Sequence, residues 1–278
     1  MKDNVALLIN SCDAYKDVMS LSLCALEEYW SDCSYPIFVN TETIEYHHNL
    51  FNIKSLNALD LNNILWGKRI KDSLSRIKEE FIIVVYDDYV LESKVMTDQI
   101  DLIIDKMEKN DKIACFYLIH SNFSLRYIPN DDLSLVDASN YYQVNSAPAI
   151  WRRETLIKLL EDSENPWAWE FFAMFKKTVK DLIFCSINAD TPNIYNYNHV
   201  KGGAVYRGKW VEEVVCPKIE KYELDIDVDQ RGLIKMEDLK PRSFLWKINF
   251  FITGFNMVGF SAFNLIPYVL KAKFKFIK

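Results

Sequence analysis

The sequence lacks the cysteine patterns that indicate an oxidising compartment or a structural metal site. The six cysteines are Cys12, Cys24, Cys33, Cys115, Cys185 and Cys216. They form no CxxC pair and no other metal-ligand spacing, and several of them lie inside apolar runs. A thiol in such a run packs as a small hydrophobic group. The N-terminal segment "MKDNVALLIN" also lacks the apolar length and the small-residue cleavage site of a signal peptide. These absences predict reduced cysteines, no export and a cytoplasmic protein.

The sequence also lacks an excess of positive charge. Its 33 lysines and arginines are outnumbered by 39 aspartates and glutamates, so the net charge is −6. Because nucleic-acid binding draws most of its affinity from neutralising phosphates, no nucleic-acid partner is expected. The charge is unevenly distributed: residues 242–278 contain six basic and no acidic residues and contribute +6, while residues 1–241 contribute −12.

The basic tail, residues 242–278, is strongly apolar as well, and the 23 residues from Ile248 to Leu270 carry no charge. A bilayer span takes about 20 residues. Pro267 interrupts the end of this segment, and polar side chains recur inside it near helical spacing, at Asn249, Thr253, Asn256 and Asn264. This pattern favours an amphipathic helix that lies in the plane of a membrane over a helix that spans it.

The expected partner of this tail is an anionic membrane surface. In that arrangement four phenylalanines would enter the headgroup boundary: Phe250, Phe251, Phe255 and Phe260. Four lysines would meet anionic lipid: Lys271, Lys273, Lys275 and Lys278. Packing of the segment against the rest of the chain, or against a second copy in a homo-oligomer, is the alternative.

Strand and helix patterns alternate along the chain, of which half the residues are apolar. In order they are "NVALLIN", residues 17–30, "YPIFVN", residues 64–77, "FIIVVY", residues 100–107 and "KIACFYLI". Such alternation predicts an α/β fold with a mostly parallel sheet covered by helices on both faces. A polar segment, residues 121–142, predicts an insertion, and helices at 154–160 and after "ENPW" and a strand at "LIFCSI" follow it.

Two aspartates stand side by side in "FIIVVYDDYVLES", the segment from Phe81 to Ser93. The apolar run before them is typical of a central strand, and open α/β sheets bind ligands beyond the carboxyl ends of their strands. An ordinary turn or helix cap also explains adjacent aspartates. A carboxylate pair in this position favours a hard divalent cation, held by one or two carboxylates together with phosphate oxygens. Nucleotide-sugar diphosphates supply such oxygens.

Several segments together resemble bacterial GT-A-type glycosyltransferases of surface-polysaccharide synthesis, such as capsule, O-antigen or lipooligosaccharide. They are "VALLINSCDAYKDV", "YWSDCSYPIFVNTE", "SLSRIKEEFIIVVYDDYVLE" and "NPWAWE", and the likeness covers roughly residues 4–210. The resemblance implies a GT-A, Rossmann-like fold with a nucleotide-binding half and an acceptor-binding half. It also implies that Mn²⁺ or Mg²⁺ bridges the donor diphosphate to a DxD-like motif, here Asp87-Asp88-Tyr89.

The expected organisation is therefore a glycosyltransferase domain, residues 1–241, followed by a membrane-associating helical tail, residues 242–278. The nucleotide-binding half of the domain would cover about residues 1–120 and the acceptor half about residues 121–241. Asp88 is expected to hold the metal and Asp87 to support the donor. Asp13 and Ser11, which follow the first strand, are expected to contact the nucleoside, although a polar turn explains Ser11 nearly as well. Arg69 is expected to pair with a phosphate, with surface solvation as the alternative.

Glu170 lies among aromatic residues in "ENPWAWEFF". Apolar surroundings raise the pKa of a carboxylate toward the range of a general base, and similar inverting transferases use an acidic residue at this place. Glu170 is thus the expected base, and a helix cap or salt bridge is the alternative. Farther on, "HVKGGAVYRGKW" combines glycines with basic residues. It loosely resembles the part of several GT-A enzymes that supplies a late metal-binding histidine and a basic loop. This resemblance suggests His199 as a metal ligand and Lys201, Arg207 and Lys209 as partners of the diphosphate.

Together these observations predict a metal-dependent glycosyltransferase that moves a sugar from a nucleotide-sugar donor, UDP-linked by expectation, to a glycan or lipid-linked acceptor. It would work on the cytoplasmic face of the cell membrane and invert the anomeric centre. Two alternatives remain. A sugar-1-phosphate nucleotidyltransferase needs a glycine-rich basic loop after the first strand, where "NSCDAYKDV" has no glycine. A catalytically inactive, membrane-associated carbohydrate-binding protein would share the fold without turnover.

Overall fold

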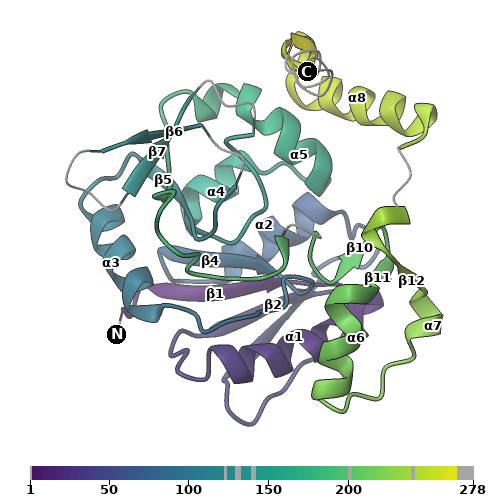
Figure 1. The fold of residues 1–278 in the computed structure, drawn as a ribbon. Coiled ribbons are helices and arrows are strands. Elements are labelled where there is room, and N and C mark those ends of the chain that lie inside the picture. The colour runs from purple at the N-terminus through teal and green to yellow at the C-terminus, as the bar shows by residue number, and fades with distance from the viewer. Residues whose placement is uncertain are drawn as a thin grey trace.

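The computed structural model describes residues 2–121, 124–128, 133–138, 142–199, 202–238 and 242–267. Its centre is a nine-stranded sheet in the order β3-β2-β1-β4-β8-β5-β9-β7-β6, with helices on both faces (Figure 1). A smaller sheet contains β10, β11 and β12. The α/β fold predicted from the alternation of strands and helices is confirmed.

Four neighbouring strands run parallel and belong to the first third of the chain: β1 (Val5–Asn10), β2 (Ile37–Thr41), β3 (Ile53–Asn57) and β4 (Phe81–Tyr86). β4 lies inside the sheet and is buried up to its last residue, which confirms the central strand predicted for "FIIVVY". β1 and β4 pair without a shift from Val5↔Phe81 to Asn10↔Tyr86. Ser11 and Asp87 therefore leave the sheet side by side.

Five strands between residues 113 and 187 complete the same sheet. β8 (Ala149–Arg152) lies between β4 and β5 (Ile113–Tyr117) and is antiparallel to both, while β9 (Ile183–Ile187) pairs parallel with β5. The segment predicted as an insertion contributes β6 (Leu125–Tyr127) and β7 (Leu133–Val136), an antiparallel pair joined to β9. The sheet is thus mixed, and both predicted halves share it.

The sheet separates two layers of the core, because successive side chains of a strand point to opposite faces. In β1, Leu7 and Ile9 belong to one buried cluster, and Ala6 and Leu8 belong to the other. The first layer includes residues of α1 (Lys16–Tyr29), α3 (Thr97–Glu108) and α6 (Glu212–Lys221). The second includes residues of α2 (Trp66–Arg76), α4 (Arg153–Leu159) and α5 (Pro166–Phe172). Short 3-10 helices are η1 (Asp13–Tyr15), η2 (Ala173–Phe175) and η3 (Lys177–Val179).

The smaller sheet contains the basic, glycine-containing segment. β10 (Val205–Tyr206) and β11 (Lys209–Val211) form a hairpin, and β12 (Leu233–Ile234) pairs parallel with β11. In the sequence β12 lies between α7 (Val228–Arg231) and η5 (Met236–Asp238). Arg207 and Gly208 connect the two strands with φ angles of 54° and 80°. Two positive φ angles are typical of a type I′ turn, so the described part of this segment is a hairpin. Lys201 lies outside the described residues.

The tail forms α8 (Phe244–Val258), followed by the 3-10 helix η6 (Gly259–Asn264) (Figure 1). Ser243 caps α8, since its Oγ accepts a hydrogen bond from the Trp246 N–H at 3.2 Å. The predicted helical tail is confirmed over this range, whereas Lys271, Lys273, Lys275 and Lys278 lie outside the described residues.

One prediction about the tail is wrong. Phe250 and Phe251 do not face outward, because both pack against α5. Their ring centroids lie 5.0 and 6.3 Å from that of Phe172. The sequence pattern identified an apolar helix but could not distinguish the face that packs on the domain from the face that remains exposed.

The first turn of α2 depends on a glycine. The Gly67 N–H donates a hydrogen bond to the Glu164 carbonyl oxygen at 3.2 Å, and a Cβ atom at Gly67 would lie 2.0 Å from the Glu161 carbonyl oxygen. The backbone of the α4–α5 connection thus occupies the space of a side chain. This close approach fixes the position of α2 beside the sheet.

We expect Gly67→Ala to destabilise the protein by about 1–3 kcal/mol, since the new methyl group must displace backbone atoms. Thermal unfolding should show a melting temperature lowered by several degrees. Ser75→Ala, at an exposed position of the same helix, is the matched control and should leave it nearly unchanged. Equal melting of Gly67→Ala and wild type would contradict the close packing.

Candidate functional site

The carboxyl ends of β1, β2 and β4 surround a cavity of about 240 Å³, which we call the strand-end cavity. Its walls come from the strand ends, α2 and the start of α5: Asn10, Ser11, Cys12, Tyr15, Asn40, Trp66, Arg69, Tyr86, Asp87, Asp88 and Pro166. This is the position at which open α/β sheets bind ligands. Four of the predicted site residues, Ser11, Arg69, Asp87 and Asp88, therefore share one cavity.

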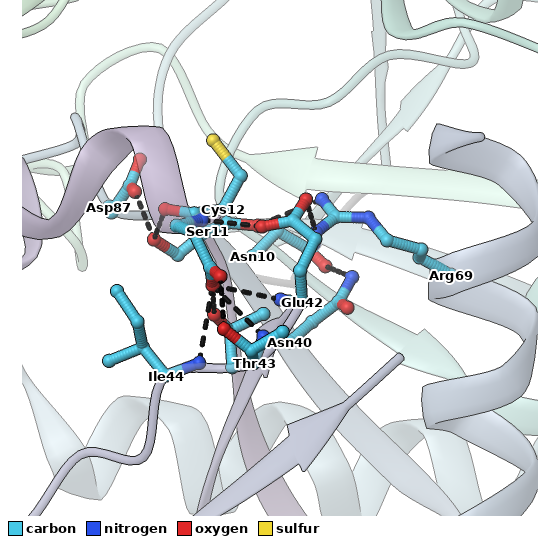
Figure 2. Close-up of polar contacts among 11 residues, drawn as sticks. Asn10, Ser11, Cys12, Asn40, Glu42, Thr43, Ile44, Arg69 and Asp87 are labelled. Atoms are coloured by element: carbon cyan, nitrogen blue, oxygen red, sulfur yellow. Dashed lines mark hydrogen bonds and ion pairs between the residues drawn. The ribbon is translucent and has the colours of Figure 1, made fainter. Parts of the chain in front are cut away.

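Asp87 is held at the base of this cavity by Ser11, whose Oγ donates a hydrogen bond to Asp87 Oδ2 at 2.5 Å (Figure 2). Asp87 is only 5% exposed, and burial raises the pKa of its carboxyl group to about 7 despite the Ser11 hydrogen bond. Burial, and then the neighbouring charge of Asp87, raise the pKa of Asp88 well above its usual value. Two adjacent carboxylates are thus costly to ionise in this structure.

The backbone of Asp88 lies directly against Gly203. The Ala204 N–H donates a hydrogen bond to the Asp88 carbonyl oxygen at 2.8 Å, and Gly203 has a φ angle of 86°. A Cβ atom at Gly203 would lie 2.8 Å from that same oxygen and 3.3 Å from Asp88 Oδ2. A glycine is required here because of both the φ angle and the close contact. The segment before β10 is therefore fitted onto the end of β4.

Arg69 reaches the cavity wall from α2, where it is 8% exposed. Its guanidinium forms an ion pair with Glu42 and donates a hydrogen bond to the Ser11 carbonyl oxygen at 2.9 Å (Figure 2). Glu42, which no sequence motif indicated, also accepts a hydrogen bond from the Asp13 N–H. Arg69 thus ties the ends of β1 and β2 together.

Asp13 orders the segment that follows β2. Its carboxylate accepts hydrogen bonds from the hydroxyl groups of Thr41 and Thr43, at 2.8 and 2.5 Å, and from the backbone N–H groups of Glu42, Thr43 and Ile44. Although burial alone would raise the pKa of Asp13, these hydrogen bonds lower it below its usual value. The charge of Asp13 is thus stabilised by hydrogen bonds within the chain. Asp13 also borders a hollow of about 550 Å³, whose walls include Gly208 and Arg231.

Asn10 and Asn40 form part of the cavity wall and were also missed. The Asn40 Nδ2 donates a hydrogen bond to Asn10 Oδ1 at 3.1 Å. Within the part of the chain that the structure describes, the buried Asn10 Nδ2 and Asn40 Oδ1 have no hydrogen-bond partner. The two amide groups are thus incompletely hydrogen-bonded within the described residues. Both residues end apolar strand patterns, which is a signal that could have identified them.

A second cavity, of about 310 Å³, contains Glu170 and is called the Glu170 cavity. Its walls include Tyr89, Ile119, His120, Ser121, Tyr142, Asn145, Ala147, Tyr197 and His199. The Glu170 carboxylate accepts hydrogen bonds from the Ser146 N–H at 3.0 Å, from the Ser146 hydroxyl and from the Tyr142 hydroxyl at 3.1 Å. Burial nevertheless raises the pKa of Glu170. An oriented carboxylate with a raised pKa is suited to accept a proton.

Aromatic side chains form another part of this cavity. The rings of Tyr89 and Tyr197 stack with centroids 4.4 Å apart and an interplanar angle of 20°. The His199 ring lies 6.1 Å from that of Tyr197. Among the described residues no group of three or more histidine, cysteine or acidic side chains is placed to hold a metal, so the structure does not group His199 with Asp87 and Asp88.

The two described basic residues of the β10–β11 hairpin lie apart from the strand-end cavity walls. The Arg207 guanidinium carbon lies 5.0 Å from the centroid of the Tyr206 ring, and Lys209 is exposed. Gly208, between them, borders the hollow beside Asp13. The turn of the hairpin therefore lies beside the same hollow as Asp13.

No protein-family profile and no curated protein matches the sequence. Among solved structures, residues 1–349 of S. aureus TarS have a TM-score of 0.50 and 14% identity, over 82% of this chain and 68% of that one. TarS in complex with UDP-GlcNAc has a TM-score of 0.48 at 14% identity, over 82% and 69% of the two chains. A cytidylyltransferase from Leptospira borgpetersenii has a TM-score of 0.39 at 13% identity, over 70% of this chain and 80% of that one.

This chain therefore has a glycosyltransferase-like fold. At such low identity the likeness of the TarS 1–349 structure is evidence for the fold alone. Substrate, metal and chemistry must be argued from the residues of this chain.

The raised pKa of Asp87 makes stability depend on pH. Between the unfolded pKa, about 4, and the folded pKa, about 7, the folded protein keeps a proton that the unfolded chain releases. Stability should therefore fall as the pH rises through this window, by about 1.4 kcal/mol for each unit of difference. Asp87→Asn keeps an oxygen that can accept the Ser11 hydrogen bond. Because the amide does not ionise, the substitution removes the loss of stability at higher pH.

We expect the melting temperature of Asp87→Asn to exceed that of wild type by several degrees at pH 8 and by much less at pH 4.5. Asp111→Asn, at a side chain that is 96% exposed, is the control. A constant difference between Asp87→Asn and wild type across this range would show that Asp87 does not titrate as inferred.

Proposed function

We propose that this protein is a metal-dependent glycosyltransferase that moves a sugar from a nucleotide-sugar donor to an acceptor hydroxyl group. One observation carries the proposal: the residues that end β4 line both cavities. Asp87 and Asp88 lie in the wall of the strand-end cavity, and the next residue, Tyr89, lies in the wall of the Glu170 cavity. The two cavities thus meet at the end of β4. In this proposal the strand-end cavity offers a carboxylate pair to the sugar donor, and the Glu170 cavity offers a base to the acceptor hydroxyl group.

The donor would occupy the strand-end cavity. Asn10 and Asn40 would contribute amide groups of the cavity wall to the recognition of a base or ribose. Ser11 and Arg69 hold the strand ends in place, so their role is to position Asp87 and the cavity wall. Asp13 supports the neighbouring wall through its hydrogen bonds to residues 41–44. A UDP-sugar is the proposed donor.

The residues at the end of β4 fit a divalent cation, Mn²⁺ or Mg²⁺. Two carboxylates whose pKa values are raised by burial would be stabilised in their charged form by a cation. Asp88, with Asp87, would hold the ion, and phosphate oxygens of the donor would complete its ligands. The bound ion would supply charge stabilisation of the departing diphosphate. His199 is not part of the proposed ligand set, because it faces the Glu170 cavity.

The acceptor would occupy the Glu170 cavity. Glu170, held by Ser146 and Tyr142, would take the proton of the attacking hydroxyl group. The bond from that oxygen to the anomeric carbon forms as the bond from the anomeric carbon to the diphosphate breaks, which inverts the centre. The stacked Tyr89 and Tyr197 offer an aromatic surface for a sugar ring. Arg207 and Lys209 lie outside the walls of the strand-end cavity, so they are not part of the proposed diphosphate site.

The proposed setting is bacterial surface-polysaccharide synthesis on the cytoplasmic side of the membrane, with a glycan or lipid-linked acceptor. The proposal is distinguished from a sugar-1-phosphate nucleotidyltransferase by the segment after β1. That segment forms η1 (Asp13–Tyr15) and contains no glycine, whereas a nucleotidyltransferase would use a glycine-rich basic loop there.

The test is a panel of UDP-, GDP-, dTDP- and CMP-sugars incubated with the full chain, with and without Mn²⁺. Transfer or slow hydrolysis that releases a nucleotide and depends on the metal supports the proposal. Release of pyrophosphate from a nucleoside triphosphate and a sugar 1-phosphate would instead identify a nucleotidyltransferase. Absence of turnover with every donor would favour a carbohydrate-binding protein.

We expect Asp88→Asn to lower turnover by roughly two orders of magnitude or more while the protein remains folded, because the amide loses the charge that holds the cation. Turnover is measured at saturating Mn²⁺, and thermal unfolding verifies the fold. Asp111→Asn serves again as the exposed control. Near wild-type turnover of Asp88→Asn would disprove the proposed metal site.

We expect Glu170→Gln to lower turnover by roughly 10²–10⁴-fold with little change in donor affinity, as is typical for loss of a general base. Donor affinity is measured by calorimetric titration with UDP and Mn²⁺. Glu154→Gln, at a side chain that is 61% exposed, is the matched control. If UDP binding collapsed in Glu170→Gln, Glu170 would belong to the donor site or to the structure.

A further inference from the structure

The tail exposes a continuous set of large apolar side chains. The exposed fractions are 75% for Phe244, 73% for Leu245, 52% for Ile252 and 82% for Phe260. Ile248 and Phe255 are exposed to 40% and 38%. We call these six residues the outer face of α8 and η6. Contiguous exposed apolar surface of this kind marks a site of interaction with a membrane or another protein.

The orientation of this face is fixed by the packing of the opposite side of α8. A Cβ atom at Gly254 would lie 2.2 Å from the Phe172 ring, so α8 contacts α5 closely through this glycine. Phe250 stacks on Trp246 and packs on Phe172 with centroid distances of 5.1 and 5.0 Å. The outer residues Phe244, Ile248, Ile252 and Phe255 recur every three or four positions, which places them on one side of the helix. The outer face is thus the surface left after α8 has packed on the domain.

We infer that the outer face docks on an anionic membrane surface with α8 lying in the membrane plane. The charge of the tail supports this partner, because residues 242–278 contain six basic and no acidic residues. Within the described part, the Arg242 guanidinium lies 4.7 Å from the ring centroids of both Trp167 and Trp246, and Lys247 is exposed. Aromatic and basic side chains in one place suit the boundary between headgroups and acyl chains.

A second copy of the chain is a poorer partner for the same face. In a symmetric dimer each tail would meet an identical tail, so two segments of charge +6 would be brought together. Anionic lipid compensates this charge, and each lysine or arginine near the surface contributes about 1 kcal/mol to the free energy of binding.

The packing also distinguishes docking in the plane from spanning. The segment Phe244–Pro267 is long and apolar enough to cross a bilayer by length and composition. Crossing would require the side of α8 that packs on Phe172 to leave α5, and it would place the exposed Asn249 and Asn256 in lipid. An orientation in the plane keeps the contact with α5 and leaves these polar groups near water.

If the proposed function holds, docking would also bring the acceptor site close to the membrane. α8 packs on α5, the helix that carries Glu170, so a docked protein would hold the Glu170 cavity close to the bilayer. A lipid-linked acceptor would then be concentrated at the site that uses it.

The test is flotation of the purified full chain with vesicles of phosphatidylglycerol and phosphatidylcholine across a salt series. The variant L245Q/I252Q/F260Q removes apolar surface only from the outer face. The control L59Q/L61Q/L102Q removes leucines that are 63%, 58% and 53% exposed elsewhere on the molecule. We expect wild type and control to float at low salt and the outer-face variant to bind at least about tenfold more weakly. We also expect weaker binding to pure phosphatidylcholine and at high salt.

Four outcomes would overturn the inference. They are failure of wild type to float at low salt, equal flotation of both triple variants, binding that resists high salt and alkaline carbonate as a spanning helix would, and a dimer that the outer-face variant abolishes without any vesicle binding. Since flotation measures binding and not sugar transfer, failure here would leave the proposed function standing. Failure of the sugar-transfer assay would likewise leave the membrane inference intact.

Discussion

The parallel pairing of β1 with β4 is the constraint on which the candidate site depends. The two strands pair residue for residue up to Asn10 and Tyr86, so the next residues, Ser11 and Asp87, are adjacent and form a hydrogen bond of 2.5 Å. A shift of one residue would turn every side chain of β4 to the other face of the sheet. The cavity, the carboxylate pair and the position of Tyr89 toward Glu170 all follow from this register.

Burial of two adjacent carboxylates opposes stability, and the surrounding structure is arranged to tolerate it. Ser11 donates to Asp87, and the Gly203–Ala204 segment packs on the backbone of Asp88. The ion pair of Arg69 with Glu42 holds the neighbouring strand ends together. A site that buries two ionisable carboxyl groups at such cost, in the same cavity wall as Asn10 and Asn40, is consistent with a cation and a nucleotide as its ligands.

The sequence was sufficient for features that depend on local pattern. The central strand "FIIVVY", the aspartates at its end and the helix that carries Arg69 all lie where periodicity and composition predicted them. Features that depend on contacts between distant residues could not be predicted. The insertion of β8 between β4 and β5, the pairing of Glu42 with Arg69 and the inward orientation of Phe250 and Phe251 follow from tertiary packing. Asn10 and Asn40 each end an apolar strand pattern, but the hydrogen bond between them depends on the pairing of β1 with β2.

The central claim is that the end of β4 binds a nucleotide sugar through a divalent cation. A crystal structure of the full chain with UDP and Mn²⁺, recorded to measure the anomalous scattering of manganese, tests it most directly. The account predicts a manganese peak within ligand distance of the Asp88 carboxylate, shared with the diphosphate, and the nucleoside beside Asn10 and Asn40. A nucleotide bound elsewhere, or a manganese peak away from Asp87 and Asp88 at saturating UDP, would contradict it.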